Sequence, residues 1–246
     1  MKHKYLSLFA LPLAIALLLG GGAVFAAEIL PGGILGATKE GVRAKMGEPS
    51  HYYIEEHHAR RHWLFPVEDI DTIRPMLWAR PDIPIDDVFP VEKDGKNFLY
   101  RAHYERDKRQ ESQPVQRAVK CWALFKGESV TLADLPHLVP EFEIATKPGV
   151  LVYQQKSPAG GDEIVVTFLV PESSDLARAV SSYFKPPVDD YEWSPSFEVV
   201  LRKGESENIT LDSKVHELVI TVGSQTRINK LARVFNIKDI ANPFPS

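Results

Sequence analysis

The longest apolar stretch of the chain lies at its amino terminus. Lys2 and Lys4 precede an uncharged apolar run over residues 6–19, and glycines and other small residues follow it. A basic start, an apolar core and small residues come in the order of a secretory signal. We therefore expect a signal peptide over residues 1–26, followed by a linker over residues 27–33.

A retained membrane anchor is the alternative interpretation of this segment. The uncharged stretch over residues 5–27 is long enough to cross a bilayer, which takes roughly 20 apolar residues. Pro12 and the glycines at 20–22 weaken a continuous helix there. Both interpretations place the rest of the chain outside the cytosol, in the periplasm or beyond the cell. Membrane contact is expected only if the segment is retained.

A short amphipathic helix is predicted just after the linker. Thr38 is a suitable N-cap, and Val42 and Met46, four residues apart, share one helix face. Gly47 favours the left-handed conformation that ends a helix, and Pro49 prevents the helix from resuming.

Further along the chain, β-branched and aromatic residues recur in short runs that are typical of strands. Two such runs, 150–155 and 164–170, flank a Pro/Gly turn and predict a β-hairpin. Residues 66–97 contain many prolines and aspartates, so we expect them to be irregular apart from a helical turn at 70–78. Further strands are predicted over residues 50–57, 62–65, 98–104, 118–125, 197–201 and 218–222, and helices over 174–183 and 226–235.

Together these elements predict an α+β fold, mainly antiparallel β with a few short helices. We expect a module over residues 34–110, which includes the Pro/Asp-rich extension, and a β-rich α+β domain over residues 111–246. Cys121 is the only cysteine, so no internal disulfide forms and the fold depends on its core.

The amino-terminal pattern resembles a known family. Leu35-Gly36-Ala37-Thr38 opens the predicted helix, Met46-Gly47-Glu48-Pro49 ends it, and His62-Trp63-Leu64-Phe65 forms a strand. This order is similar to the BamE/SmpA-OmlA family of small bacterial envelope domains. The resemblance implies a BamE-like amino-terminal module, with short helices on a small antiparallel sheet, that mediates protein–protein contact. It supplies no catalytic residues, and this chain lacks the family's lipid-bearing cysteine.

The charge balance narrows the class of partner. Lysine and arginine total 29 against 33 acidic residues, a formal net charge of −4. Nucleic-acid binding requires a strongly basic surface, so we do not expect a nucleic-acid partner. Another envelope protein or a surface component is the expected partner.

Aromatic and arginine residues suggest where that partner binds, because Tyr, Trp and Arg concentrate binding energy at interfaces. The chain has no catalytic motif, and we therefore predict a non-catalytic extracytoplasmic binding protein. The same aromatics are equally typical of a hydrophobic core. The predicted contact surface comprises Trp63, Trp78, Arg80, Tyr100 and Tyr104.

Metal binding or metal delivery is the first alternative function. His57, His58 and His62 lie close together in the sequence, and imidazole is a common ligand of zinc, copper or iron. On a strand, however, His58 and His62 point to one face and His57 to the other. We therefore expect no cofactor and keep the histidine site as the alternative.

An extracytoplasmic hydrolase with dispersed catalytic residues is the second alternative. Cys121 would act as a nucleophile if His103 or His137 lay beside it, but its strand position among apolar residues favours a buried core thiol. A group of aspartates lacks the spacing of a calcium-binding loop, so we expect solvated loop charge there. That group comprises Asp69, Asp71, Asp82, Asp86 and Asp87.

Overall fold

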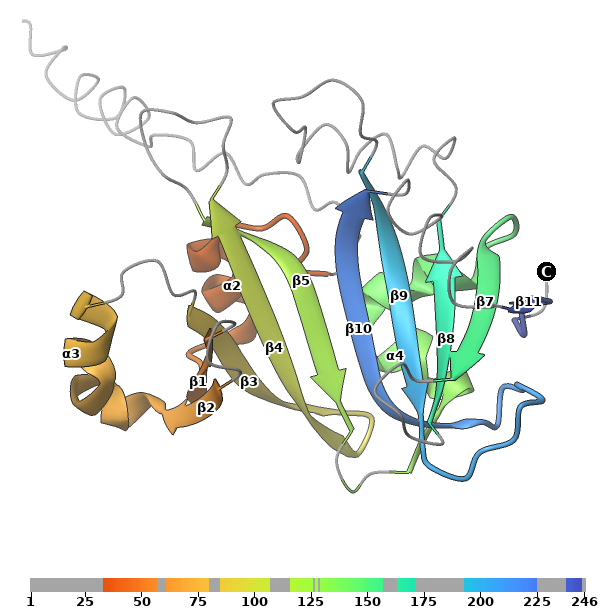
Figure 1. Cartoon of the computed structure of the whole chain (residues 1–246), viewed down its shortest axis with the longest axis horizontal. Coiled ribbons are helices and arrows are strands. Elements are labelled where there is room, and N and C mark those ends of the chain that lie inside the picture. Colours follow the sequence, from red (N-terminus) through yellow and green to blue (C-terminus); the bar gives the residue numbers. More distant parts are fainter. Residues whose placement is uncertain are drawn as a thin grey trace, which may run out of the picture.

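The computed structural model describes residues 33–56, 61–79, 85–106, 116–125, 127, 129–156, 163–170, 193–224 and 238–244. The predicted signal peptide and the helices predicted at 174–183 and 226–235 lie outside these ranges. All the described strands belong to one antiparallel sheet of eleven strands (Figure 1).

Ten of the strands follow one another across the sheet in the order β11-β7-β8-β9-β10-β5-β4-β3-β1-β2, and the short β6 pairs with β10. The strands are β1 (His51–Glu56), β2 (Arg61–Pro66), β3 (Ile85–Lys93), β4 (Lys96–Arg106), β5 (Gln116–Leu124), β6 (Val130–Thr131), β7 (Leu151–Lys156), β8 (Ile164–Leu169), β9 (Trp193–Leu201), β10 (Lys214–Ser224) and β11 (Lys238–Ile240). The helices are α2 (Lys39–Met46), α3 (Ile70–Ala79) and α4 (Leu135–Leu138), with 3₁₀ segments η1 (Val67–Asp69), η2 (Leu132–Asp134) and η3 (Pro140–Thr146).

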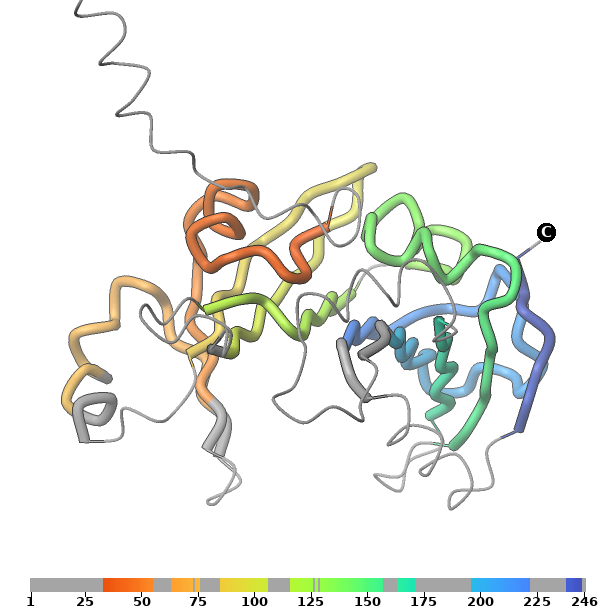
Figure 2. Tube along the Cα trace, turned by 90° about the horizontal axis from the view of Figure 1, so that it is seen from above, coloured from red at the N-terminus to blue at the C-terminus, as the bar shows by residue number. Residues whose placement is uncertain are grey.

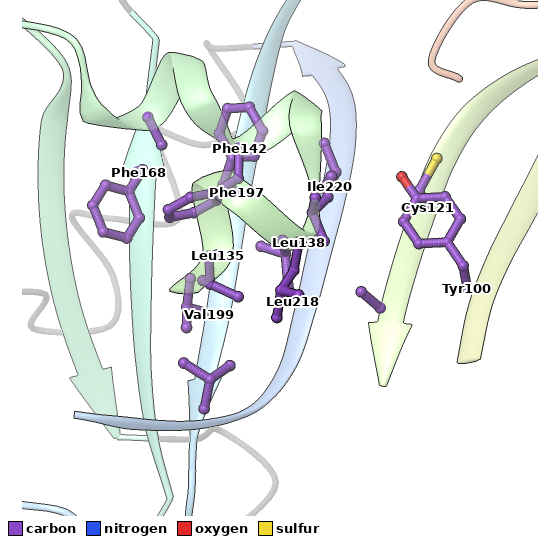
Figure 3. Close-up of a cluster of buried hydrophobic side chains, with 14 of the residues drawn as sticks. Tyr100, Cys121, Leu135, Leu138, Phe142, Phe168, Phe197, Val199, Leu218 and Ile220 are labelled. Atoms are coloured by element: carbon purple, nitrogen blue, oxygen red, sulfur yellow. The ribbon is translucent and has the colours of Figure 1, made fainter. Parts of the chain in front are cut away.

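Helix α2 and the α4–η3 segment lie on the same side of the sheet, which we call the covered face (Figure 2). The opposite side is called the second face. Phe142 of η3 packs edge-on against Phe168 of β8 and Phe197 of β9, with ring centroids 5.2 and 5.6 Å apart (Figure 3). Leu135 and Leu138 of α4 are also buried there. The covered face therefore carries the hydrophobic core.

The predicted α+β class with a BamE-like amino-terminal module is wrong. The amino-terminal strands do not form a small sheet of their own, because β5 pairs with β4 on one side and with β10 on the other. An unpaired β5 would leave a row of backbone donors and acceptors without partners, and pairing with β10 satisfies them. The result is one predominantly antiparallel sheet with few short helices. The predicted boundary after residue 110 falls between the paired strands β4 and β5.

Two predictions of local structure are confirmed. The helix after Thr38 is confirmed, since the Thr38 hydroxyl accepts a hydrogen bond from the Gly41 amide and Gly47 has a positive φ of 84°. The hairpin of β7 and β8 is also confirmed.

The prediction that residues 66–97 are irregular is wrong over most of that range. The helical turn expected at 70–78 is the longer α3, and β3 occupies residues 85–93. Strand β3 tolerates Pro90 because β1 pairs only with Ile85–Val88, so Pro90 lies beyond the end of β1. A proline is acceptable in a strand where no neighbour needs its amide.

Candidate functional site

The second face carries a cluster of charged and aromatic side chains near the middle of the sheet. Arg101 and His103 are two residues apart on β4 and therefore project from the same face. Strand pairing places Tyr53 opposite Asp86, and Trp122 opposite Arg101. We call these five residues the Arg101 cluster.

Hydrogen bonds to one buried carboxylate hold Arg101 and His103 in place. Nε of Arg101 donates to Oδ2 of Asp86 at 2.6 Å, and Nδ1 of His103 lies 2.7 Å from Oδ1. The Asp86 side chain is only 3% exposed. Both carboxylate oxygens are thus engaged, and the orientations of Arg101 and His103 are fixed together.

Two aromatic rings hold the guanidinium group of Arg101 between them. Its Cζ lies 3.5 Å from the Tyr53 ring centroid and 3.6 Å from that of Trp122. The ammonium group of Lys120 lies 4.5 Å from the same Trp122 ring. Cation–π contacts of this kind strengthen when water is partly excluded, and the Arg101 side chain is 15% exposed.

Glu217 of β10 contributes a carboxyl group beside this cluster. Burial raises the pKa of Glu217, and the nearby positive charges of His216, Arg101 and Lys120 oppose that rise. The second face therefore holds cationic, anionic and aromatic groups in one ordered patch, which suits it for contact with a partner.

A hydrolase that used Cys121 as its nucleophile would need a histidine beside the thiol, and the structure places Cys121 and His103 on opposite faces of the sheet. Cys121 pairs in register with Ala102 and is buried on the covered face, whereas His103 projects from the second face. His137 is exposed on α4. Burial raises the pKa of the Cys121 thiol well above its ordinary value, so the reactive thiolate is disfavoured.

The structure also contains a histidine–carboxylate pair, His103 with Asp86. Within the described ranges, no hydroxyl or thiol is hydrogen-bonded to His103. A nucleophilic mechanism needs such a group within reach of its base. The hydrolase alternative stays a prediction.

The residues of the predicted contact surface do not gather in one place. Tyr100 and Tyr104 are 4% exposed on the covered face, as the core interpretation expects. Trp63 is opposite the buried Ile54 and lies half-buried on that same face. Trp78 belongs to α3, with its side chain outside the description, and Arg80 lies outside the described residues.

The histidine site of the metal-binding alternative falls mostly outside the description. His57 and His58 are not among the described residues, and only the backbone of His62, in β2, is described. Within the residues that are described, no group of three or more potential metal ligands occurs.

Sequence reasoning missed Asp86, Arg101, His103 and Trp122 as a group. Side chains in the strand at 98–104 alternate between the two faces of the sheet, so Tyr100 and Tyr104 lie on one face and Arg101 and His103 on the other. This alternation could have identified Arg101 and His103 as neighbours on one face.

No family model, curated protein or solved structure matches this chain. Among the described residues, no helix has the length and apolar character needed to span a membrane.

Proposed function

We propose that this chain is an extracytoplasmic binding protein that recognises another envelope protein or a surface component through the Arg101 cluster. The observation that carries the proposal is the Arg101 guanidinium held between Tyr53 and Trp122 and hydrogen-bonded to Asp86. The apolar, uncharged run near the amino terminus supports the extracytoplasmic location.

Preorganisation is the physical reason that this arrangement favours binding. A free arginine loses much rotamer freedom when a partner immobilises it, and that loss weakens association. Arg101 is already held by two rings and one carboxylate, while 15% of its side chain and 21% of the His103 side chain remain exposed. A partner that contacts these groups therefore immobilises few additional side chains on binding.

A photo-crosslinking experiment in the native cell envelope tests the proposal. Leu64 is 51% exposed and lies opposite Tyr53 in the β1–β2 pair, hence on the second face beside the cluster. A photoreactive phenylalanine analogue at Leu64 should give a discrete adduct. The same analogue at exposed Glu40, on α2 of the covered face, is the matched control.

The expected result is an adduct at Leu64 that Trp122→Ala and Arg101→Ala each reduce at least tenfold. Circular dichroism establishes that both variants fold. Adducts of equal yield from Leu64 and Glu40, or a yield that neither substitution changes, would contradict the proposed surface.

A further inference from the structure

A small cavity lies on the covered face, outside the surface proposed above. It has a volume of ≈ 150 Å³ and opens where the end of α2 approaches α4 and the strands β3 and β4. Apolar side chains form most of its wall, namely Ile34, Met46, Val91, Phe98, Leu138 and Pro140. A cavity of about this size, lined by such residues, holds a molecule as large as benzene.

One carboxylate interrupts the apolar wall. Glu141 of η3 is only 2% exposed and lines the cavity. Its Oε1 accepts hydrogen bonds from the Ile34 amide and from the Tyr100 hydroxyl, the latter at 3.1 Å. Gly33 packs so closely that a Cβ atom there would collide with the Glu141 side chain, which fixes the position of the carboxylate.

The second oxygen of this carboxylate is the unusual feature. In the described part of the chain, Oε2 of Glu141 receives no hydrogen bond. Lys93 is the other charged residue at the cavity, yet the described residues include no ion pair between it and Glu141. Oε2 is not among the fully buried side-chain atoms that lack a partner, so it remains accessible at the cavity that Glu141 lines. A ligand that brings a positive donor can therefore form a charge-assisted hydrogen bond with it.

We propose that this cavity binds a primary ammonium group on an apolar stem, with the ammonium hydrogen-bonded to Oε2 of Glu141. The apolar wall takes the stem and excludes water from the ion pair. Lys93 lines the cavity from the end of β3, where it pairs with Lys96 across the β3–β4 turn.

Two sources of such a group are distinguished by two probes. Benzylamine represents a free amine, and Nα-acetyl-lysine methylamide represents a lysine side chain presented by a peptide. Benzyl alcohol has the size of benzylamine without its charge and is the neutral control. Binding of each probe to the folded chain is measured by titration calorimetry and by chemical-shift changes.

Glu141→Gln is the matched variant, because the glutamine oxygen still accepts hydrogen bonds from Ile34 and Tyr100 while the charge is lost. At least one amine should bind saturably, and Glu141→Gln should weaken that binding tenfold or more without changing the affinity for benzyl alcohol. Failure of both amines to bind, or equal amine affinity in Glu141→Gln, would overturn the proposal.

Val91→Phe provides a second variant that leaves the carboxylate intact. Val91 is half-buried at the cavity, so a phenyl group there fills the space that the stem needs. Amine binding should be lost in this variant, and retention of the wild-type affinity would overturn the proposal even if Glu141→Gln does not fold.

Discussion

Asp86 and Asp87 are neighbours on β3, yet they serve the two faces of the sheet differently. Consecutive strand residues project to opposite faces. Asp87 accepts two hydrogen bonds from Arg43 of α2, both at 2.9 Å, and one from Tyr104 at 3.1 Å. Asp86 instead binds Arg101 and His103, both on β4.

Asp87 and Asp86 differ in role because their hydrogen-bond partners come from different parts of the fold. Arg43 is 44 residues from Asp87 in sequence and comes from a different layer, so this ion pair attaches α2 to the sheet. The partners of Asp86 lie on the adjacent strand, so that carboxylate orients side chains within one layer. The first arrangement should govern stability, and the second should govern the shape of the surface.

The largest expected effect follows from removing Asp87. Asp87→Ala removes the acceptor of Arg43, whose side chain is 31% exposed, and of the buried Tyr104 hydroxyl, and it detaches α2 from the sheet, which should lower the free energy of unfolding by about 2 kcal/mol. Urea unfolding followed by circular dichroism measures the change.

Asp86→Ala is the matched control for that experiment, because it removes the neighbouring carboxylate from the other face. It should cost less, because α2 remains attached to the sheet through Asp87 and the Arg101 guanidinium keeps its contacts with the Tyr53 and Trp122 rings. Equal losses in the two variants would contradict the division of roles.

The next largest effect is a loss of stability at alkaline pH, caused by Cys121 on the covered face. Burial raises the pKa of Cys121 well above its ordinary value of 9.0. Above pH 9 the unfolded chain therefore loses this proton while the folded chain keeps it. Because the folded state then binds more protons, stability must fall as the pH rises. The Cys121 contribution to this loss should be about 1 kcal/mol between pH 9 and pH 10.

Cys121→Ala isolates the thiol from other alkaline titrations. The variant is expected to be less stable at pH 7 because it has a smaller core side chain, but its stability should decline less steeply above pH 9. Parallel curves of unfolding free energy for wild type and variant from pH 8 to pH 10 would show that the thiol titrates normally in the folded protein.

Some elements of the fold could be predicted from the sequence, whereas the pairing of distant strands could not. Local signals such as the Thr38 cap and the β7–β8 hairpin were readable, because the interactions that form them lie within a few residues. The pairing of β5 with β10 was not readable, because it joins strands about 100 residues apart through backbone groups that every residue possesses.

The candidate site was missed for a related reason. Aspartates between prolines are typical of solvated loops, and that prediction is wrong for Asp86 and Asp87, which are 2% and 0% exposed. Their burial depends on cations supplied by α2 and β4. Charge partners of this kind leave no pattern in the sequence near the carboxylates, so only the assembled sheet reveals them.

The smallest expected effect tests whether the Tyr53 and Trp122 rings hold the Arg101 guanidinium in place, as recognition of a partner by the second face requires. Arg101→Lys keeps the charge but loses the planar group that stacks between Tyr53 and Trp122. In a double-mutant cycle with Trp122→Leu, the coupling free energy should be about 0.5–1 kcal/mol in favour of the native pair. Urea unfolding of the four proteins gives this value. A coupling indistinguishable from zero would mean that the stacked geometry contributes no preorganisation, and the case for the Arg101 cluster as a recognition surface would lose its physical basis.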